Sequence, residues 1–342
     1  MFENLDPLDF ENFENTKENG YFKETTKIND KILIVLKTTT IENLYSIFQG
    51  LKMNQTVTFI SLYSLYLGKE GARILSESIE KNNTLRSFDL RQNRFGDKGI
   101  EIICNSLKNK KLKTLRIDSN EFHELGMICV SNTFLNHPTL ENLSVNFNTC
   151  EPNTFCGLVL NNKKINHLSL ENTNMVILKE LKTNTSLTSL SMNGNSFGDY
   201  NLKILCESLK TNNSLKKLNI QRNGLSAFDP LLDSLKLNQS LIEMKIRDNK
   251  SYDPRDNSIS DQFAFEIDFL LSANRCWDIK SHSTLPALIK QIIFTFFCSL
   301  HFKSKSMQIK IPKNLIYVMV RFIDRKSYFR YVESIKTQKM YF

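Results

Sequence analysis

A nine-residue phrase, Leu85 to Asn93, constrains the fold of this chain more than any other feature. It reads as apolar, two spacers, apolar, one spacer, apolar, two spacers, Asn. The same phrase starts at Leu112, Leu140, Leu187, Leu215 and Leu241, and degenerate copies start at Val57 and Ile165. The intervals between the eight copies are 28, 27, 28, 25, 22, 28 and 26 residues. A near-constant period in this range predicts a repeat architecture.

One repeat predicts its own local structure. Phe88 and Leu90 alternate with Asp89, so the two apolar side chains point to one face of a short strand and Asp89 to the other. Phe95 to Gly99 is a turn signal with two glycines, and apolar residues then recur at helical spacing. Each unit is therefore expected to be strand, turn, helix. A single unit cannot bury its apolar face, whereas stacked units build a continuous core.

The Asn that ends the phrase stands where the backbone turns away from the strand. It occurs at Asn93, Asn120, Asn148, Asn195, Asn223 and Asn249. An amide side chain can bond both N–H and C=O groups, so stacked amides are expected to form a ladder that satisfies buried backbone. Leu65 and Thr173 take this position in repeats one and five, where the ladder should weaken.

These residues carry a resemblance. Residues 57–253 resemble a leucine-rich repeat protein of the ribonuclease-inhibitor-like subfamily, through the phrase L-x-x-L-x-L-x-x-N, the Gly-Asp-Lys-Gly turn and the period near 28. The resemblance implies an α/β solenoid: a curved horseshoe with parallel strands on the concave face and helices on the convex face. Repeat five departs from it, because Met175 to Leu181 allows about two helical turns, and we expect the curvature to change there.

The flanking segments have different compositions. Residues 1–28 are expected to be an acidic tail, residues 29–53 a degenerate repeat that caps the N-terminal end, with a helix from about 41 to 51, and residues 54–253 the eight repeats. Residues 254–342 are basic and read as a helical C-terminal cap or small domain, with helices at 263–273, at 286–297 and from Pro312. Ile311 to Ile316 is faintly similar to the opening helix of an F-box.

Charge and cysteine content bound the class of protein. The net charge is +9, but no block of five Lys or Arg occurs, so nucleic acid is an unlikely partner by sequence. Seven cysteines without a Cys-x-x-Cys pair argue against a disulfide framework or a zinc site. Without a signal peptide or a run long enough to span a bilayer, the sequence predicts a cytoplasmic, monomeric protein, with a nuclear location also open.

No catalytic motif stands out. There is no Gly-rich phosphate loop, His-Glu-x-x-His or Gly-x-Ser-x-Gly, and the five histidines are scattered. His167 is expected on the inner strand face as an ordinary surface histidine. Cys104, Cys129 and Cys206 lie at similar places in their repeats and are expected to pack on the helices. We expect no enzyme activity, no cofactor and no metal.

The candidate site is the concave strand face, where side chains are not needed for the core. Its partner-binding candidates are Asp89, Arg91, Arg116, Asp118, Asn146, Glu171, Asn193, Lys217, Gln221, Lys245 and Arg247. The simpler alternative is that Arg91 and Arg116 only pair with Asp118 and Asp89 across neighbouring strands.

The leading hypothesis is a non-enzymatic scaffold that grips a protein partner on this face, because a rigid curved sheet loses little conformational entropy on binding. Two alternatives are a ubiquitin-ligase substrate adaptor that docks through the F-box-like helices, and a Ran-type GTPase-activating regulator. The sequence does not name the partner.

Overall fold

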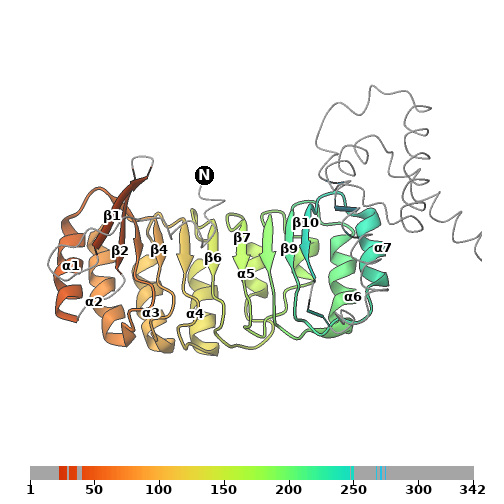
Figure 1. Cartoon of the computed structure of the whole chain (residues 1–342), viewed down its shortest axis with the longest axis horizontal. Coiled ribbons are helices and arrows are strands. Elements are labelled where there is room, and N and C mark those ends of the chain that lie inside the picture. The colour runs from red at the N-terminus through yellow and green to blue at the C-terminus, as the bar shows by residue number, and fades with distance from the viewer. Residues whose placement is uncertain are drawn as a thin grey trace, which may run out of the picture.

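The computed structural model describes residues 23–28, 31–36, 41–246 and 248–249, together with Ile267, Leu270, Leu271 and Asn274. Within them, ten strands form one sheet whose spatial order equals the sequence order. β1 and β2 form an antiparallel hairpin, and every later strand is parallel to its neighbour. The molecule is thus a leucine-rich repeat solenoid, a shallow arc with strands along the inner side and helices along the outer side (Figure 1).

The parallel strands confirm the predicted repeats. The strands are β1 (Lys23–Ile28), β2 (Lys31–Leu36), β3 (Val57–Ser61), β4 (Ser87–Asp89), β5 (Thr114–Arg116), β6 (Asn142–Ser144), β7 (His167–Ser169), β8 (Ser189–Ser191), β9 (Lys217–Asn219) and β10 (Glu243–Lys245). From β3 onward each lies at the second apolar position of one copy of the phrase. In register, Phe88 stands opposite Leu115, and Asp89 opposite Arg116.

Helices follow most strands. They are α1 (Ile41–Met53), α2 (Gly68–Lys81), α3 (Gly96–Leu107), α4 (Glu124–Phe134), α5 (Cys156–Asn161), α6 (Gly198–Leu209) and α7 (Asp229–Leu237). Their apolar faces pack on the sheet, so one core runs the length of the array. The expected turn at Gly96 and Asp97 is instead the first turn of α3. Gly96 has a φ of +59° there, which explains the glycine.

The predicted amide ladder is present. Asn120 Oδ1 accepts the backbone N–H of Asn93 at 3.0 Å, and its Nδ2 donates to the carbonyls of Leu90 and Ile117 at 2.9 and 3.0 Å. The amides at the other five positions make equivalent bonds, and all six are buried. In repeat five the Thr173 hydroxyl donates to Leu170 in its own repeat. The ladder is therefore interrupted between repeats four and five, as predicted.

A second amide ladder, which the sequence analysis missed, lies at the opposite end of the strands. Asn82 Nδ2 donates to the carbonyls of Leu51 and Asn54 at 2.8 and 2.9 Å, while its Oδ1 accepts the N–H of Leu85. Further amides repeat the arrangement at Asn162, Asn184, Asn212, Asn238 and Asn274. The signal was available, since an Asn recurs three residues before the first apolar residue of the phrase.

Two repeats depart from this arrangement. In one, Asn109 takes the position but is exposed, and the next residue, Lys110, donates through Nζ to the carbonyls of Glu80 and Asn82, at 2.8 and 3.0 Å. His137 replaces Asn in the next repeat, and its Nδ1 accepts the N–H of Leu140 at 3.1 Å. Burial lowers the pKa of His137, although the carbonyls of Leu107 and Lys110 oppose that shift. The imidazole is therefore held neutral inside the fold.

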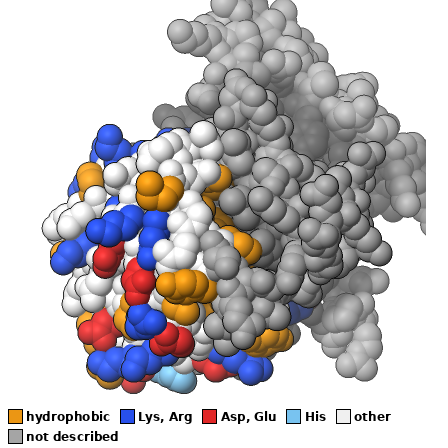
Figure 2. All heavy atoms as spheres, turned by 90° about the vertical axis from the view of Figure 1, so that its left-hand side faces the viewer, with side chains coloured by type: hydrophobic (Ala, Val, Ile, Leu, Met, Phe, Trp, Pro, Cys, Tyr) orange, Lys and Arg blue, Asp and Glu red, His pale blue; other side chains and the backbone are white. Residues whose placement is uncertain are grey.

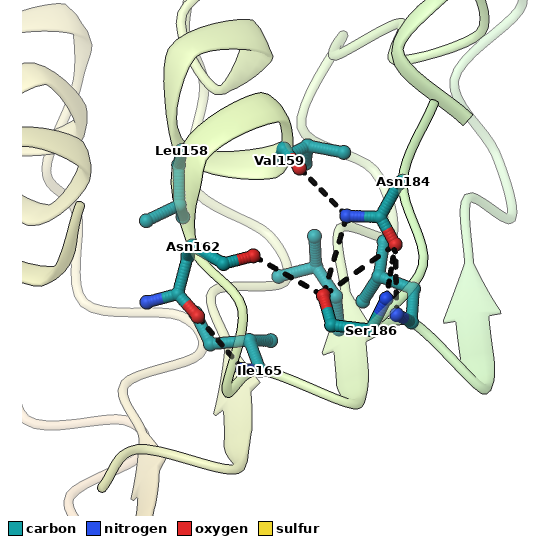
Figure 3. Close-up of a pocket in the computed structure, with 8 residues that line it drawn as sticks. Leu158, Val159, Asn162, Ile165, Asn184 and Ser186 are labelled. Atoms are coloured by element: carbon teal, nitrogen blue, oxygen red, sulfur yellow. Dashed lines mark hydrogen bonds between the residues drawn. The ribbon is translucent and has the colours of Figure 1, made fainter. Parts of the chain in front are cut away.

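Repeat five contains less helix than predicted. Instead of two helical turns over residues 175–181, the structure has irregular chain followed by one turn of 3-10 helix, η2 (Glu180–Lys182). Met175, Ile177 and Leu181 are buried, so the apolar residues fill the core without a helix to carry them. A cavity of about 10 Å³ lies beside this region, close to the size of one water molecule (Figure 3).

The two ends of the array depart from the simple repeat. Residues 23–28, which the sequence analysis assigned to the acidic tail, form the edge strand β1. At the other end Ile267, Leu270 and Leu271 are buried in the core, and Asn274 bonds the carbonyls of Asn238 and Leu241. The expected helices at 286–297 and from Pro312, and the F-box-like residues, lie outside the described residues.

Candidate concave-face site

The concave face is the side of the sheet that the helices leave uncovered. Two columns of side chains occupy it, one between the second and third apolar residues of each phrase and one just after the third. The first column is Ser61, Asp89, Arg116, Ser144, Ser169, Ser191, Asn219 and Lys245. The second is Tyr63, Arg91, Asp118, Asn146, Glu171, Asn193 and Gln221, and Arg247 would follow it but lies outside the described residues.

The N-terminal end of the face holds a cation, an acid and an aromatic ring in contact. Arg91 clamps Asp89 through two bonds, Nε to Oδ1 at 2.8 Å and Nη2 to Oδ2 at 2.7 Å. The guanidinium of Arg91 also lies over the ring of Tyr63, 5.1 Å from its centroid. Asp89 raises the pKa of Arg91. The cluster is therefore a preformed, bidentate ion pair against an aromatic surface.

The predicted cross-strand pairing differs from what the structure shows. Arg91 pairs with Asp89 of its own strand, and not with Asp118. Arg116 stands opposite Asp89 in register, yet both carboxylate oxygens of Asp89 already bond Arg91. A strand places residues two apart on the same face, so a long Arg side chain reaches back to Asp89 easily.

The middle of the face carries a third ladder. Asp118 Oδ1 accepts the Ser144 hydroxyl at 2.5 Å and the Asn146 N–H at 2.9 Å. One repeat later, Asn146 Oδ1 accepts the Ser169 hydroxyl at 2.9 Å and the Glu171 N–H at 2.7 Å. The carboxylate of Glu171 in turn bonds Ser191, Asn193 and Asn219. These predicted partner-binding residues thus also hold their neighbours in place.

Burial disfavours the charged form of the Asp118 carboxyl. Only 9% of Asp118 is exposed, and this burial raises the pKa of its carboxyl, against the lowering effect of the Ser144 and Asn146 hydrogen bonds and of Arg91. Asn146 performs the same bonding with a neutral amide. The negative charge of Asp118 is therefore unnecessary for the ladder itself.

The remaining predicted cations lie along the sheet. Arg116 is half-buried and makes no ion pair among the described residues. Lys217 lies 3.6 Å from Glu243, and Lys245 is exposed near the C-terminal end. At the N-terminal end, Figure 2 shows cationic and acidic side chains interleaved, with hydrophobic side chains scattered among them. The structure thus brings Asp89, Arg91, Arg116, Asp118 and Asn146 together, and leaves Lys245 far from them.

Phe147 belongs to this face and was missed by the sequence analysis. It is 57% exposed, and its φ is +56°, in the left-handed region that bulky residues rarely adopt. Its counterparts in other repeats also have positive φ, but they are small, flexible or polar residues such as Ser119, Asn172 and Gly194. An exposed aromatic residue in a strained conformation points to a role outside folding. Its position one residue before the ladder Asn was the available signal.

Tyr66 forms a second aromatic contact on the same rim. The guanidinium of Arg94 lies 4.5 Å from the centroid of the Tyr66 ring, and Arg94 pairs with Glu121 at 3.3 Å. Tyr66 is 61% exposed. Exposed aromatic residues on this rim therefore belong to the first four repeats within the part of the chain that is described.

The described residues hold no group of three or more His, Cys, Asp and Glu arranged to ligate a metal ion. His167 is half-buried in β7, with Nδ1 beside Asn166 Oδ1. Cys104 and Cys206 are buried as predicted, but Cys129 is only half-buried. Bonds with the Cys104 thiol and with Thr133 lower the pKa of Cys129 to about 7. No described helix has the length and apolar character needed to cross a bilayer.

Comparison with known proteins agrees with the repeat fold. A leucine-rich repeat family model matches residues 81–104 and 183–199. NACHT, LRR and PYD domains-containing protein 14 of Mus musculus is 26% identical over 216 residues, which cover 57% of this chain and 21% of that protein. The human NACHT, LRR and PYD domains-containing protein 12 is 27% identical over 191 residues, 52% of this chain and 18% of that protein. The chain thus matches about one fifth of the length of these relatives.

Among solved structures, the leucine-rich repeat-containing protein LegL7 from Legionella pneumophila matches with a TM-score of 0.42 and 15% identity. The match covers 65% of this chain and 75% of that one. The family model, the curated relatives and the strand order agree on leucine-rich repeats, and they leave the ribonuclease-inhibitor-like subfamily unassigned.

Proposed function

We propose that this protein is a non-enzymatic scaffold that binds a protein partner on its concave face. One observation carries the proposal: the face presents exposed aromatic and cationic side chains on a backbone fixed by three side-chain ladders. Phe147, Tyr66 and Arg116 are available for contact, whereas Asn120 and its equivalents hold the strands. A rigid surface keeps its shape on binding and so loses little conformational entropy.

Several further points belong to this proposal. Large exposed surfaces that carry aromatic and arginine side chains are typical of binding hot spots. The five described cysteines are all free thiols, which favours a reducing compartment such as the cytoplasm or nucleus. We also propose that the chain acts as a monomer and ribonuclease-inhibitor-like subfamily member. The ubiquitin-ligase alternative draws no support from the described residues, because the F-box-like residues lie outside them. Neither the described residues nor the matched relatives favour the Ran-type alternative.

The test places a bulky side chain on the concave face. Ser189 lies in β8, and its side chain makes no hydrogen bond within the described residues, so Ser189→Trp adds bulk without breaking a ladder. Lys203→Trp on the exposed side of α6 is the matched control. Affinity purification of the full chain with quantitative mass spectrometry compares the three proteins. We expect partners of the wild type and of Lys203→Trp to be depleted at least about tenfold by Ser189→Trp. Equal recovery with all three would contradict the concave face as the binding surface.

A further inference from the structure

The charges of the concave face are unequally available. Its carboxylates are all bonded within the protein: Asp89 by Arg91, Asp118 by Ser144 and Asn146, and Glu171 by Ser191. Asp89 is 5% exposed and Asp118 9% exposed. An incoming cation would therefore have to displace existing bonds before it could reach these oxygens.

Two cations of the same face are not paired in this way among the described residues, whereas Arg91 pairs with Asp89 and Lys217 lies 3.6 Å from Glu243. Arg116 is placed directly between Asp89 and Ser144 in the register of neighbouring strands, but Arg91 has taken the carboxylate of Asp89. Arg116 therefore makes no ion pair among the described residues, and its planar guanidinium keeps donors for a bidentate carboxylate. Lys245 is likewise exposed, at the C-terminal end. The charge that remains for a partner is positive.

An exposed aromatic side chain lies one repeat further along than this guanidinium. Arg116 stands opposite Ser144 in register, and Phe147 follows Ser144 by three residues, in the turn after β6. Small polar residues flank Phe147 at the same place in the neighbouring repeats, Ser119 and Asn172, and leave its ring accessible.

We propose that the concave-face partner is a protein segment that carries an Asp or Glu and, near it, a large apolar side chain. The carboxylate bonds Arg116, and the apolar side chain packs on Phe147. This inference rests on the proposed function and names the chemistry of the partner.

The test uses a phage-displayed library of random twelve-residue peptides, selected on the immobilised full-length protein. We expect the selected peptides to be enriched both in Asp or Glu and in Phe, Leu, Ile, Tyr or Trp, relative to the unselected library. A synthetic enriched peptide should lose at least about tenfold in affinity with Arg116→Gln and with Phe147→Asn, since Asn tolerates positive φ. Lys203→Gln on α6 is the charge-matched control and should change nothing. Thermal unfolding checks that each variant folds.

A charge swap separates recognition from damage. The Arg116→Glu variant should not bind the acidic peptide. It should bind the same peptide once the acidic residue of that peptide is changed to Arg. The selected peptides could instead lack acidic residues, lose affinity with Ser189→Trp and keep their affinity with Arg116→Gln. That result would overturn the acidic partner and leave the proposed function standing. Peptides whose affinity is also unchanged by Ser189→Trp would overturn both the acidic partner and the proposed function.

A last arm tests an occupant within the chain. Residues 1–22 contain six acidic residues and five aromatic ones. In the full chain, these acids are replaced by Asn and Gln. Unchanged peptide affinity is the result expected for a separate partner. A tenfold gain would show that this segment of the chain itself competes for Arg116, and would overturn the proposal of a separate protein.

Discussion

Asp118 Oδ1 accepts the backbone N–H of Asn146 at 2.9 Å, and Asn146 then repeats the same bond toward the next strand with a neutral amide. One position in consecutive repeats is thus filled by a charged and by an uncharged form of the same acceptor. The pair shows that residues of the proposed binding face also hold neighbouring repeats together, and substitutions there can separate the two roles.

Asp118→Asn is expected to stabilise the protein at pH 7. Burial raises the pKa of Asp118 above that of an unfolded Asp, so its folded form favours the proton. The contribution of Asp118 to stability is then fully present below the ordinary Asp pKa and is lost as the pH rises through the folded pKa. Asn removes this loss and keeps the acceptor for Ser144 and Asn146. Urea unfolding of the wild type and of Asp118→Asn at pH 4 and pH 7 measures this difference in stability. Asp118→Ala also removes the acceptor and should lower the free energy of unfolding by about 1–3 kcal/mol.

Asn120→Ala should lower the free energy of unfolding by about 1–3 kcal/mol, because it leaves the buried Asn93 N–H without its acceptor and removes one of the two amide donors to the Leu90 carbonyl. Thr173→Asn should act in the opposite direction, with a gain of about 1 kcal/mol, since an amide there can continue the ladder to Asn148. Both are measured by denaturant titration. A loss of stability in Thr173→Asn would show that the shortened repeat has no room for the amide.

His137→Asn should remove a pH dependence. The pKa of His137 is lowered in the fold, so the unfolded chain binds the proton more readily. Stability is complete above about 6.5, the ordinary histidine pKa, and is lost as the pH falls from there through the folded pKa. Asn serves at the same place in other repeats, for example Asn162. The difference in unfolding free energy between the wild type and His137→Asn should grow from pH 7.5 to pH 5.5. A constant difference would contradict a neutral buried imidazole.

Cys129 should be the first of the five described thiols to react with iodoacetamide at pH 7.5. Its pKa is lowered to about 7, whereas burial raises those of Cys150 and Cys156 to about 12. The thiolate is the reactive form, and Cys129 is half-buried. Peptide mapping by mass spectrometry after timed labelling gives the order. Cys129→Ser is the control variant. If the fastest labelling reaction is missing in this variant, that reaction belongs to Cys129.

The sequence predicted the repeats and one ladder because both arise from identical residues at fixed intervals. The residues equivalent to Phe88 and Leu90 fill the core in every copy, and an Asn equivalent to Asn93 stands in six of the eight, so periodicity alone reveals both roles. The concave face was predictable only as a location. Whether Arg116 is free depends on which of two arginines captures Asp89, and that choice is set by side-chain reach. Repeat five was partly misjudged, since Met175, Ile177 and Leu181 are buried by irregular chain that no helical spacing describes.

The interruption between Asn148 and Thr173 has a mechanical consequence. In a linear array each repeat is held by its neighbours, so the total stability is a sum of units and of the couplings between them. The junction of repeats four and five lacks the amide link and contains the small cavity beside Ile165. This junction therefore lacks one bond that joins the neighbouring Asn-ended repeats, and we expect partial opening of the array to stop or start there. Each half would then unfold as its own cooperative block, with Phe147 at the border of the first.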